Sequence, residues 1–179
     1  MYCNHINKIE REENKIKEYK QLGAYGLVIS EGKILLIKKS GGPYDGKLDL
    51  PGGTIEFCER PAIALKRELM EEVGIEVVNY ELFDADSVAF EWQFKEDVLV
   101  KVHHTGNFYK ILDYKNDIKK EVKVDDVNDD SLGAYFYEID KLSKDELSAI
   151  AILELEKLGY KVNWFQTIDK VQRFCFFVK

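Results

Sequence analysis

The sequence predicts an α/β fold of the α+β type, in which helices flank a mixed β-sheet. Two observations lead to this class. Runs rich in Val, Ile, Tyr and Phe occur before and after a central helical stretch, and a second helical stretch follows the last of these runs. The order β, β, α, several β and α favours a mixed sheet covered by helices over a regular β-α-β winding.

The first two strands are predicted at residues 22–30 and 33–40. They flank Glu31-Gly32, a two-residue gap containing Gly that is typical of a β-hairpin turn. Residues 40–47, with the sequence SGGPYDGK, predict a loop.

The first helix is predicted from Pro61 to Val73. Pro suits the first turn of a helix, and Gly74 suits the left-handed residue just past its end. Apolar residues at i, i+3, i+7 and i+11 predict the face that is turned to the core: Ala62, Leu65, Leu69 and Val73.

Three further strands and a second helix complete the predicted domain. Residues 76–92, 100–114 and 132–140 read as strands with acidic loops between them. The second helix is predicted at 143–159, because Ser143 and Glu146 are spaced as a capping box and Gly159 is a stop signal.

We therefore predict one domain at residues 22–159, preceded by a charged arm or short helix at 1–21. The segment 160–179 reads as an apolar tail that packs on the domain or on a second subunit, which is compatible with a homodimer.

The composition narrows the compartment and the partners. The formal net charge of -7 argues against a broad surface for polymeric nucleic acid or an anionic membrane, so a polyanionic substrate would need a bound cation or a local basic pocket. The scattered Cys3, Cys58 and Cys175 form no disulfide pattern, and the N-terminal stretch has no apolar signal region. We expect a cytoplasmic protein with no membrane span.

Three acids, Glu68, Glu71 and Glu72, fall on one face of the predicted first helix, within a sector of about 100°. Their carboxylates should converge at the edge of the core, where desolvation makes mutual repulsion worse. A divalent cation such as Mg²⁺ would offset this repulsion, since it prefers carboxylate oxygens. The plain alternative is a set of solvated surface acids.

The spacing around these acids decides between the two interpretations. The chain has Gly53, five residues, Glu59, seven residues, Arg67-Glu68-Leu69, one residue, Glu71-Glu72, one residue and Gly74-Ile75. This pattern resembles the signature of the Nudix hydrolase family, the MutT-type nucleotide pyrophosphohydrolase superfamily, at every position.

The resemblance implies a fold, a reaction and a cofactor. The fold is an α/β/α sandwich around a mixed β-sheet, with a loop-helix-loop catalytic motif. The reaction is attack of water on a phosphorus of a nucleoside diphosphate linked to another group, as in a nucleoside triphosphate, ADP-ribose or a nucleotide-sugar. The cofactor is Mg²⁺ or Mn²⁺.

The resemblance also implies roles for single residues. The metal ligands would be Gly52, through its carbonyl, and Glu68, Glu71 and Glu72. Glu59 would pair with Arg67 and brace the loop against the helix, and Glu68 is the leading candidate for the general base. An acid from a later loop is the alternative base, and the acidic stretch that offers one, otherwise a solvated loop, contains Glu121, Asp125, Asp126, Asp129 and Asp130.

Two departures from the family pattern lie beside the signature. Leu48 stands where members often have Trp, and Arg60 stands where a Ser or Thr often caps the helix. The second departure bears on stability, because replacing a good cap costs about 1 kcal/mol.

The substrate-binding residues lie outside the signature. Aromatic residues in or near predicted strands are candidates for stacking on a nucleobase, with core packing as the alternative for each: Tyr25, Phe90, Trp92, Phe108 and Tyr109. His103 and His104 are neighbours on a predicted strand, so they should point to opposite faces and only one can serve the site.

Two other functions stay open at this point. One is a non-catalytic, nucleotide-binding Nudix regulator, although a pure binder has no need of all the acids. The other is an isoprenoid diphosphate isomerase, which calls for a catalytic Cys. Cys58 lies inside the signature loop and is interpreted as a small packing residue instead.

Overall fold

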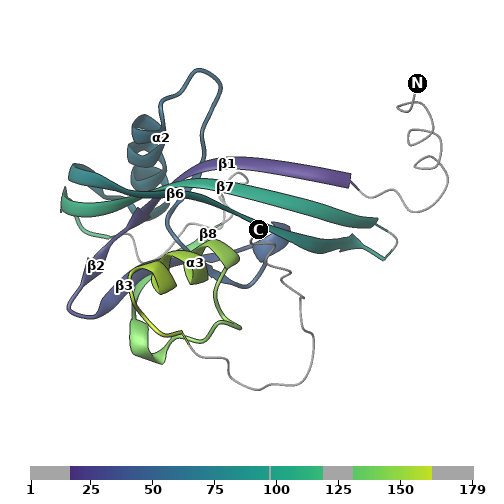
Figure 1. Cartoon of the computed structure of the whole chain (residues 1–179). Coiled ribbons are helices and arrows are strands. Elements are labelled where there is room, and N and C mark those ends of the chain that lie inside the picture. Colours follow the sequence, from purple (N-terminus) through teal and green to yellow (C-terminus); the bar gives the residue numbers. More distant parts are fainter. Residues whose placement is uncertain (1–16, 97, 119–130, 163–179) are drawn as a thin grey trace.

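The computed structural model describes residues 17–96, 98–118 and 131–162 (Figure 1). The strands are β1 (Lys17–Leu27), β2 (Ile29–Ser30), β3 (Lys33–Lys39), β4 (Leu48–Asp49), β5 (Gly52–Thr54), β6 (Glu76–Lys95), β7 (Val98–Lys115) and β8 (Ser131–Glu138). The helices are α2 (Pro61–Glu68) and α3 (Ala149–Lys157), with short helical turns η1 (Gly42–Tyr44), η2 (Leu69–Val73) and η3 (Ile139–Lys141).

The strands form two four-stranded sheets. The first has the order β5-β1-β7-β6, in which β1 and β7 run parallel and the other pairs antiparallel. In the second, β3 pairs with β2 and β4 along one edge and with β8 along the other. The predicted mixed α+β architecture is confirmed, but the first predicted strand is divided at Val28 between the two sheets.

The hairpin predicted at Glu31-Gly32 is confirmed. Ile29 pairs with Ile34 and Ser30 with Lys33, and both turn residues have positive φ, 49° and 73°. Two successive residues with positive φ are what a two-residue turn of type I′ requires.

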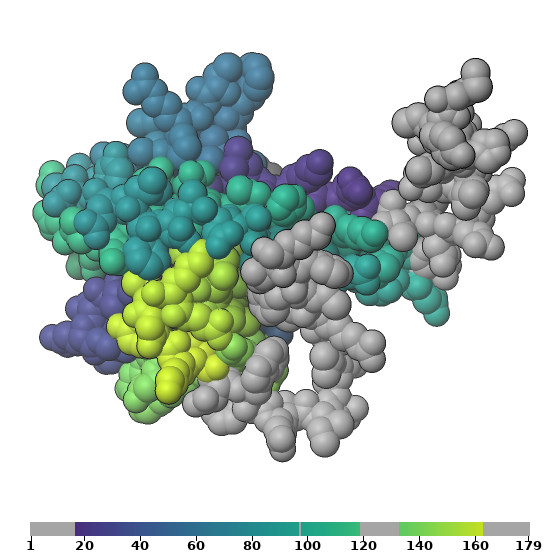
Figure 2. All heavy atoms as spheres, viewed as in Figure 1, coloured from purple at the N-terminus to yellow at the C-terminus, as the bar shows by residue number. Residues whose placement is uncertain are grey.

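Helices α2 and α3 lie on opposite sides of the sheets (Figure 1 and Figure 2). Strand β3 shows why. Ile34 and Leu36 face the core cluster that contains α3, whereas Leu35 and Ile37 face the cluster that contains α2. Alternate residues of a strand point to opposite faces, so a strand covered on both sides must be apolar throughout, as the run ILLI is.

The first predicted helix is present as α2 continued by η2, and Gly74 follows it in the left-handed conformation (φ 77°, ψ 9°). Leu65, Leu69 and Val73 are fully buried as predicted. Ala64 rather than Ala62 completes the buried face. No side chain caps the helix at Arg60, in line with the expected lack of a Ser or Thr there.

The predicted start of the second helix is wrong. Glu146 does reach back to the Ser143 backbone N–H (3.2 Å), as a capping box does, but α3 begins only at Ala149 with Ser148 as its N-cap. The residues between are held by β4, since the Leu48 N–H donates to the Glu146 carbonyl and the Ser148 N–H donates to the Leu48 carbonyl. The predicted stop at Gly159 (φ 87°) is confirmed.

Some predictions on the chain ends fall outside the described residues. Residues 17–21, assigned to the N-terminal arm, continue β1, and residues 1–16 lie outside the description. Tyr160 and Val162 pack against the core beside α3, and the rest of the tail lies outside, as does the acidic stretch from Glu121 to Asp130. Within the described residues, no helix is both long and apolar enough to cross a membrane.

Ser148 links α3 to β4 and supplies a stability test. Its hydroxyl accepts from the Ala151 N–H (3.2 Å) and donates to the buried Asp49 carboxylate (2.5 Å). We expect Ser148→Ala to lower the free energy of unfolding by about 2 kcal/mol, because it removes a cap and leaves a buried acceptor with one donor fewer. Urea denaturation measures this change, with the exposed Ser87→Ala as control. Equal midpoints for the two variants would contradict this role.

Candidate active site

Two of the three acids line a cleft of about 340 Å³, whose wall includes residues of β1, β3, β5, the first helix and the η1 loop. Glu68 and Glu72 line one part of it with the Gly52-Gly53 loop. Another part is lined by side chains from five elements, β1, β3, η1, β4 and β7: Tyr25, Lys39, Tyr44, Asp49 and His104. The sequence pattern thus locates a real cavity, and most of its wall comes from outside the signature.

The two loop glycines are required by close approaches. Gly52 has φ 137°, and a Cβ there would lie 2.3 Å from the Ala24 carbonyl oxygen. A Cβ on Gly53 would lie 2.7 Å from the Glu68 carboxylate. The loop therefore runs directly against Glu68. Gly52 has no room for a side chain because backbone atoms lie in the way, whereas a side chain at Gly53 would displace the Glu68 carboxylate.

Glu72 is held inside the protein by the widened helical turn η2. In this turn the Gly74 N–H donates to the Leu69 carbonyl, and Leu69, Glu72 and Val73 are all buried. The Glu72 carboxylate accepts from the Gly52 N–H (2.8 Å) and lies 3.7 Å from the Lys39 ammonium. Single π-type turns inside helices are frequent at functional sites.

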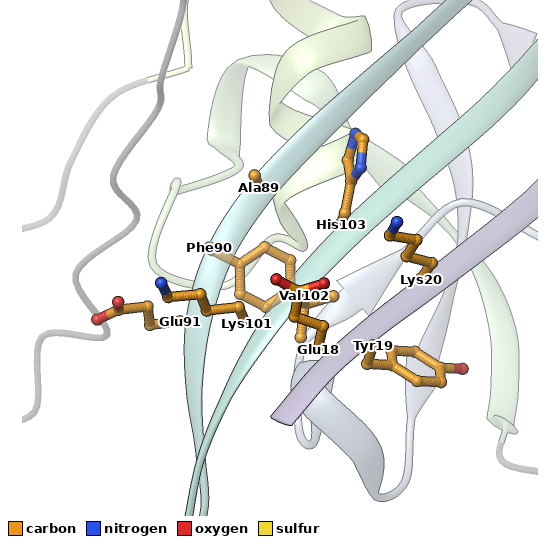
Figure 3. A pocket seen from close by; sticks show the side chains of 9 residues that line it. All are labelled: Glu18, Tyr19, Lys20, Ala89, Phe90, Glu91, Lys101, Val102 and His103. Carbon is orange, nitrogen blue, oxygen red and sulfur yellow. The ribbon is translucent and has the colours of Figure 1, made fainter. Parts of the chain in front are cut away.

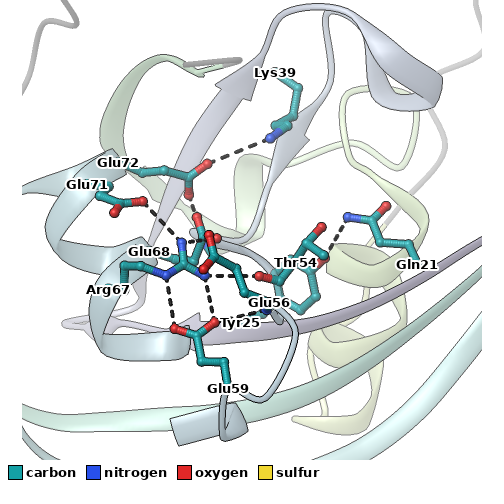
Figure 4. A network of polar contacts seen from close by, with 11 residues as sticks. Gln21, Tyr25, Lys39, Thr54, Glu56, Glu59, Arg67, Glu68, Glu71 and Glu72 are labelled. Carbon is teal, nitrogen blue, oxygen red and sulfur yellow. Dashed lines mark hydrogen bonds and ion pairs between the residues drawn. The ribbon is translucent and has the colours of Figure 1, made fainter. Parts of the chain in front are cut away.

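Arg67 joins the loop to the acids (Figure 4). Its Nε and Nη2 donate to the two oxygens of Glu59 at 3.0 and 2.9 Å, so the predicted Glu59–Arg67 contact is confirmed as a bidentate pair. Nη2 also donates to the Thr54 carbonyl (3.1 Å), while Nη1 donates to Glu68 (2.7 Å) and Glu71 (3.2 Å). Hydrogen bonds from Arg67 hold the pKa of Glu59 below its usual range.

The three carboxylates take different partners in the structure. Glu68 and Glu71 share the Arg67 guanidinium, while Glu72 turns to Gly52 and Lys39. Within the described ranges, no three acidic, His or Cys side chains are arranged to hold a metal ion. The fixed cations Arg67 and Lys39 therefore already offset part of the repulsion that the sequence interpretation assigned to a divalent ion alone.

The donor chemistry nevertheless suits a hard divalent cation. Burial raises the pKa of Glu68, against the opposing effect of Arg67, so its ionised form gains from an added positive charge. The Glu71 side chain is 59% exposed and has room to turn. Carboxylate and backbone carbonyl oxygens are the ligands that Mg²⁺ and Mn²⁺ take.

A buried histidine forms the floor of the cleft. His104 is 1% exposed, and its Nε2 and Nδ1 lie 2.5 and 3.1 Å from the hydroxyl oxygens of Tyr25 and Tyr44. Burial, with the nearby Lys39 ammonium, lowers the pKa of His104 to about 4, and burial raises the pKa of both tyrosines. All three groups are therefore neutral near pH 7.

The predicted aromatic substrate contacts are mostly core residues. Tyr25 and Phe108 are 2% and 0% exposed and stack on each other at 5.7 Å, so neither ring is open to a nucleobase, and only the hydroxyl end of Tyr25 reaches the cleft. Phe90 is buried in the same core, and Trp92 and Tyr109 also pack in core clusters.

A second pocket of about 500 Å³ lies on the first sheet (Figure 3), and none of Glu68, Glu71 and Glu72 lines it. Phe90 and His103 line this pocket, whereas His104 lines the acidic cleft, so the prediction that the two histidines face opposite ways is confirmed. Cys58 is exposed in the signature loop rather than packed, which corrects the predicted packing role.

Several residues that line the cleft were not predicted, among them Gln21, Lys39, Tyr44 and Asp49. Asp49 offered a signal, because an acid between two leucines in LDLPGG is unusual for a surface loop. Tyr44 stands beside Pro43 in a Gly-rich loop. Lys39 and Gln21 offered no signal that separates them from other strand residues.

A family model described as the NUDIX domain matches residues 20–158, which is more than half of the chain. The chain belongs to the NUDIX domain family. The predicted family resemblance is thereby confirmed.

Curated relatives of this NUDIX chain match over part of its length. An 8-oxo-dGTP diphosphatase from Haemophilus influenzae is 41% identical over 63 residues, 34% of this chain and 46% of the relative. An ADP-ribose pyrophosphatase from Methanocaldococcus jannaschii is 33% identical over 70 residues, 39% of this chain and 41% of the relative. The matched stretch thus spans less than half the length of these two relatives.

Solved structures of NUDIX proteins support the fold. The crystal structure of a MutT NUDIX hydrolase from Burkholderia pseudomallei has a TM-score of 0.63 at 22% identity and covers 78% of this chain and 98% of that chain. A MutT protein from Bacillus halodurans has a TM-score of 0.57, also at 22% identity, over 80% of this chain and 85% of that chain.

The neutral state of His104 predicts a pH dependence. Its folded pKa, about 4, lies below the ordinary 6.5, so the folded state binds this proton less readily than the unfolded state. The stability linked to it is fully present above pH 6.5 and is lost as the pH falls toward 4. The unfolding free energy of the wild type should therefore fall by about 3 kcal/mol more than that of His104→Gln between pH 7 and 4.

Urea denaturation at a series of pH values measures this difference. The matched control is His103→Gln, which removes an imidazole from the opposite face of the same strand. Parallel stability curves for the wild type and His104→Gln would show that the buried imidazole does not set this slope.

Proposed function

We propose that this NUDIX protein is a divalent-metal-dependent pyrophosphohydrolase. It would cleave a diphosphate bond in a nucleoside diphosphate linked to another group, by attack of water on phosphorus. One observation carries the proposal: Glu68 and Glu72 line a single cleft, and the Gly52-Gly53 loop runs against Glu68 within a complete family signature.

The names of the relatives support this reaction class. They include an 8-oxo-dGTP diphosphatase, an ADP-ribose pyrophosphatase and a nucleoside triphosphatase. The substrates in these names are all nucleotides with a phosphoanhydride bond. The substrate of this chain would be a small nucleotide of that kind, not polymeric nucleic acid.

Glu68, Glu71, Glu72 and the Gly52 carbonyl would hold Mg²⁺ or Mn²⁺. When bound, such an ion neutralises phosphate oxygens and lowers the pKa of a coordinated water. The residues of this chain supply the rest. Arg67 fixes the loop and holds Glu68, and the Lys39 ammonium in the cleft wall offers a positive charge to a polyanionic substrate.

Proton removal from the attacking water falls to a carboxylate at the same edge of the cleft. Glu68 is our candidate, because its carboxylate lies against the loop and is oriented by Arg67 at 2.7 Å. The alternative base from the acidic stretch 121–130 lies outside the described residues.

No observation favours the isoprenoid diphosphate isomerase. Cys58 lies on an exposed loop, and the described residues that line the cleft include no Cys. We also propose a cytoplasmic location, because the three cysteines are dispersed and form no disulfide pattern. The apolar tail is compatible with a homodimer.

Glu68→Gln and Glu72→Gln test the proposal. Each change removes a charge and a basic oxygen from the cleft, so we expect each to reduce kcat/KM for hydrolysis by about 100-fold or more. The assay is phosphate release, after phosphatase coupling, from a panel of nucleoside triphosphates, ADP-ribose and nucleotide-sugars in Mg²⁺ or Mn²⁺. EDTA should abolish turnover.

The matched control is Glu76→Gln, the same change at an exposed position paired with Lys115. Full turnover in EDTA, or in both cleft variants, would refute the hydrolase. A wild type that binds Mg²⁺ and nucleotide but turns over no member of the panel would instead indicate the non-catalytic regulator.

A further inference from the structure

The floor of the cleft contains a continuous chain of hydrogen bonds from Gln21 through Tyr25 and His104 to Tyr44. Gln21 Nε2 lies 3.3 Å from the Tyr25 hydroxyl oxygen, and His104 bridges the two tyrosines at 2.5 and 3.1 Å. Gln21 and Tyr25 are neighbours on β1, whereas Tyr44 and His104 are distant from them in sequence, and all four line the cleft. Neither the signature nor the proposed reaction assigns a role to them.

The direction of donation along this chain follows from the groups at each step. The Gln21 amide donates to the Tyr25 oxygen, which leaves the Tyr25 proton for His104 Nε2. A neutral imidazole has one donor and one acceptor, so Nδ1 then carries the ring proton and donates to Tyr44. The distances agree, since 2.5 Å suits an O–H donor and 3.1 Å suits an N–H donor.

Tyr44 is therefore the last member and has a proton to give. Its oxygen accepts from His104, and among the described residues it has no second hydrogen-bonding partner. The ring is fixed between Phe90 and His104, at centroid distances of 5.3 and 5.7 Å, on the η1 turn at the cleft wall. A rigid donor that faces a cavity selects ligands with an acceptor at that place.

The neighbouring charge limits the type of acceptor. The Asp49 carboxylate, buried in the same wall, contributes to the raised pKa of Tyr44 and would repel a phosphate oxygen. An uncharged carbonyl oxygen meets no such repulsion.

We propose that Tyr44 is a specificity-determining residue, whose hydroxyl proton, oriented by Gln21, Tyr25 and His104, is donated to a carbonyl oxygen of the substrate nucleobase. This inference rests on the proposed nucleotide substrate. It adds that the cleft favours bases with a ring carbonyl.

The direction of the chain has a direct spectroscopic readout. The ¹⁵N chemical shifts of the His104 ring in the wild type should show the proton on Nδ1. Gln21→Glu replaces the amide donor by a carboxylate that only accepts, so it should reverse every bond and move the proton to Nε2. Gln93→Glu, the same change at an exposed position on β6, is the control. A proton on Nε2 in the wild type would overturn the proposal.

Binding measures the contact with the base. Inosine monophosphate carries a ring carbonyl that purine riboside monophosphate lacks, and calorimetry gives the ratio of their dissociation constants. Loss of one neutral hydrogen bond in Tyr44→Phe should weaken inosine monophosphate about three- to tenfold and leave the purine compound unchanged. Gln21→Glu should also weaken the binding of inosine monophosphate relative to the purine compound. Tyr137→Phe, a change at a partly buried tyrosine outside the cleft, should not.

Equal weakening of both compounds, or no change in either, would overturn the role of Tyr44, as would a wild type that does not bind inosine monophosphate. These readouts need no turnover, so they separate this inference from the proposed hydrolysis. If Tyr44→Phe does not fold, as circular dichroism would show, the ¹⁵N measurement on the wild type still decides the direction of the chain.

Discussion

The structure of the cleft depends on the Arg67 guanidinium. Its five hydrogen bonds reach a loop carbonyl and three carboxylates, and they tie the loop before α2 to the helix that carries the acids. A planar fork with five donors satisfies this set in a way that a lysine ammonium does not. Because Arg67 holds Glu68 and Glu71 as well as Glu59, it both braces the loop and lowers the repulsion among the acids. Any cation that enters the cleft must compete with Arg67 for these oxygens.

Local spacing is what made the signature readable. Gly53, Glu59, Arg67 and Glu68 lie within sixteen residues, and their contacts follow from one loop and one helix whose geometry is set by short-range rules. The family, the mixed α+β fold, the hairpin at Glu31-Gly32 and the Glu59–Arg67 pair were predicted for this reason. The rotamers of the acids were not predicted. The sequence pattern gives the face of a helix on which a side chain lies, but it does not give the cation to which that side chain turns.

Long-range contacts explain what the sequence did not reveal. The start of α3 depends on hydrogen bonds between residues 48 and 146–148, which no local capping pattern contains. Ser143 and Glu146 do form half of a capping box, but the backbone around them is already bound to β4. The aromatic candidates show the same limit. Tyr25 and Phe108 are brought together by the parallel pairing of β1 with β7, and this register buries both rings.

The same register determines how the cleft can recognise a substrate. The pairing of Gln21 with His104 places the histidine where Tyr25 and Tyr44 close over both of its ring nitrogens, so the floor offers oriented hydroxyl groups instead of an aromatic face. A buried imidazole that is satisfied on both sides cannot turn or take up a proton without breaking a hydrogen bond, and this fixes the polarity of the wall beside it. The acids and Arg67 are set by local sequence and suit the diphosphate that all substrates of this class share. Discrimination among bases then falls to side chains that only the tertiary fold brings together.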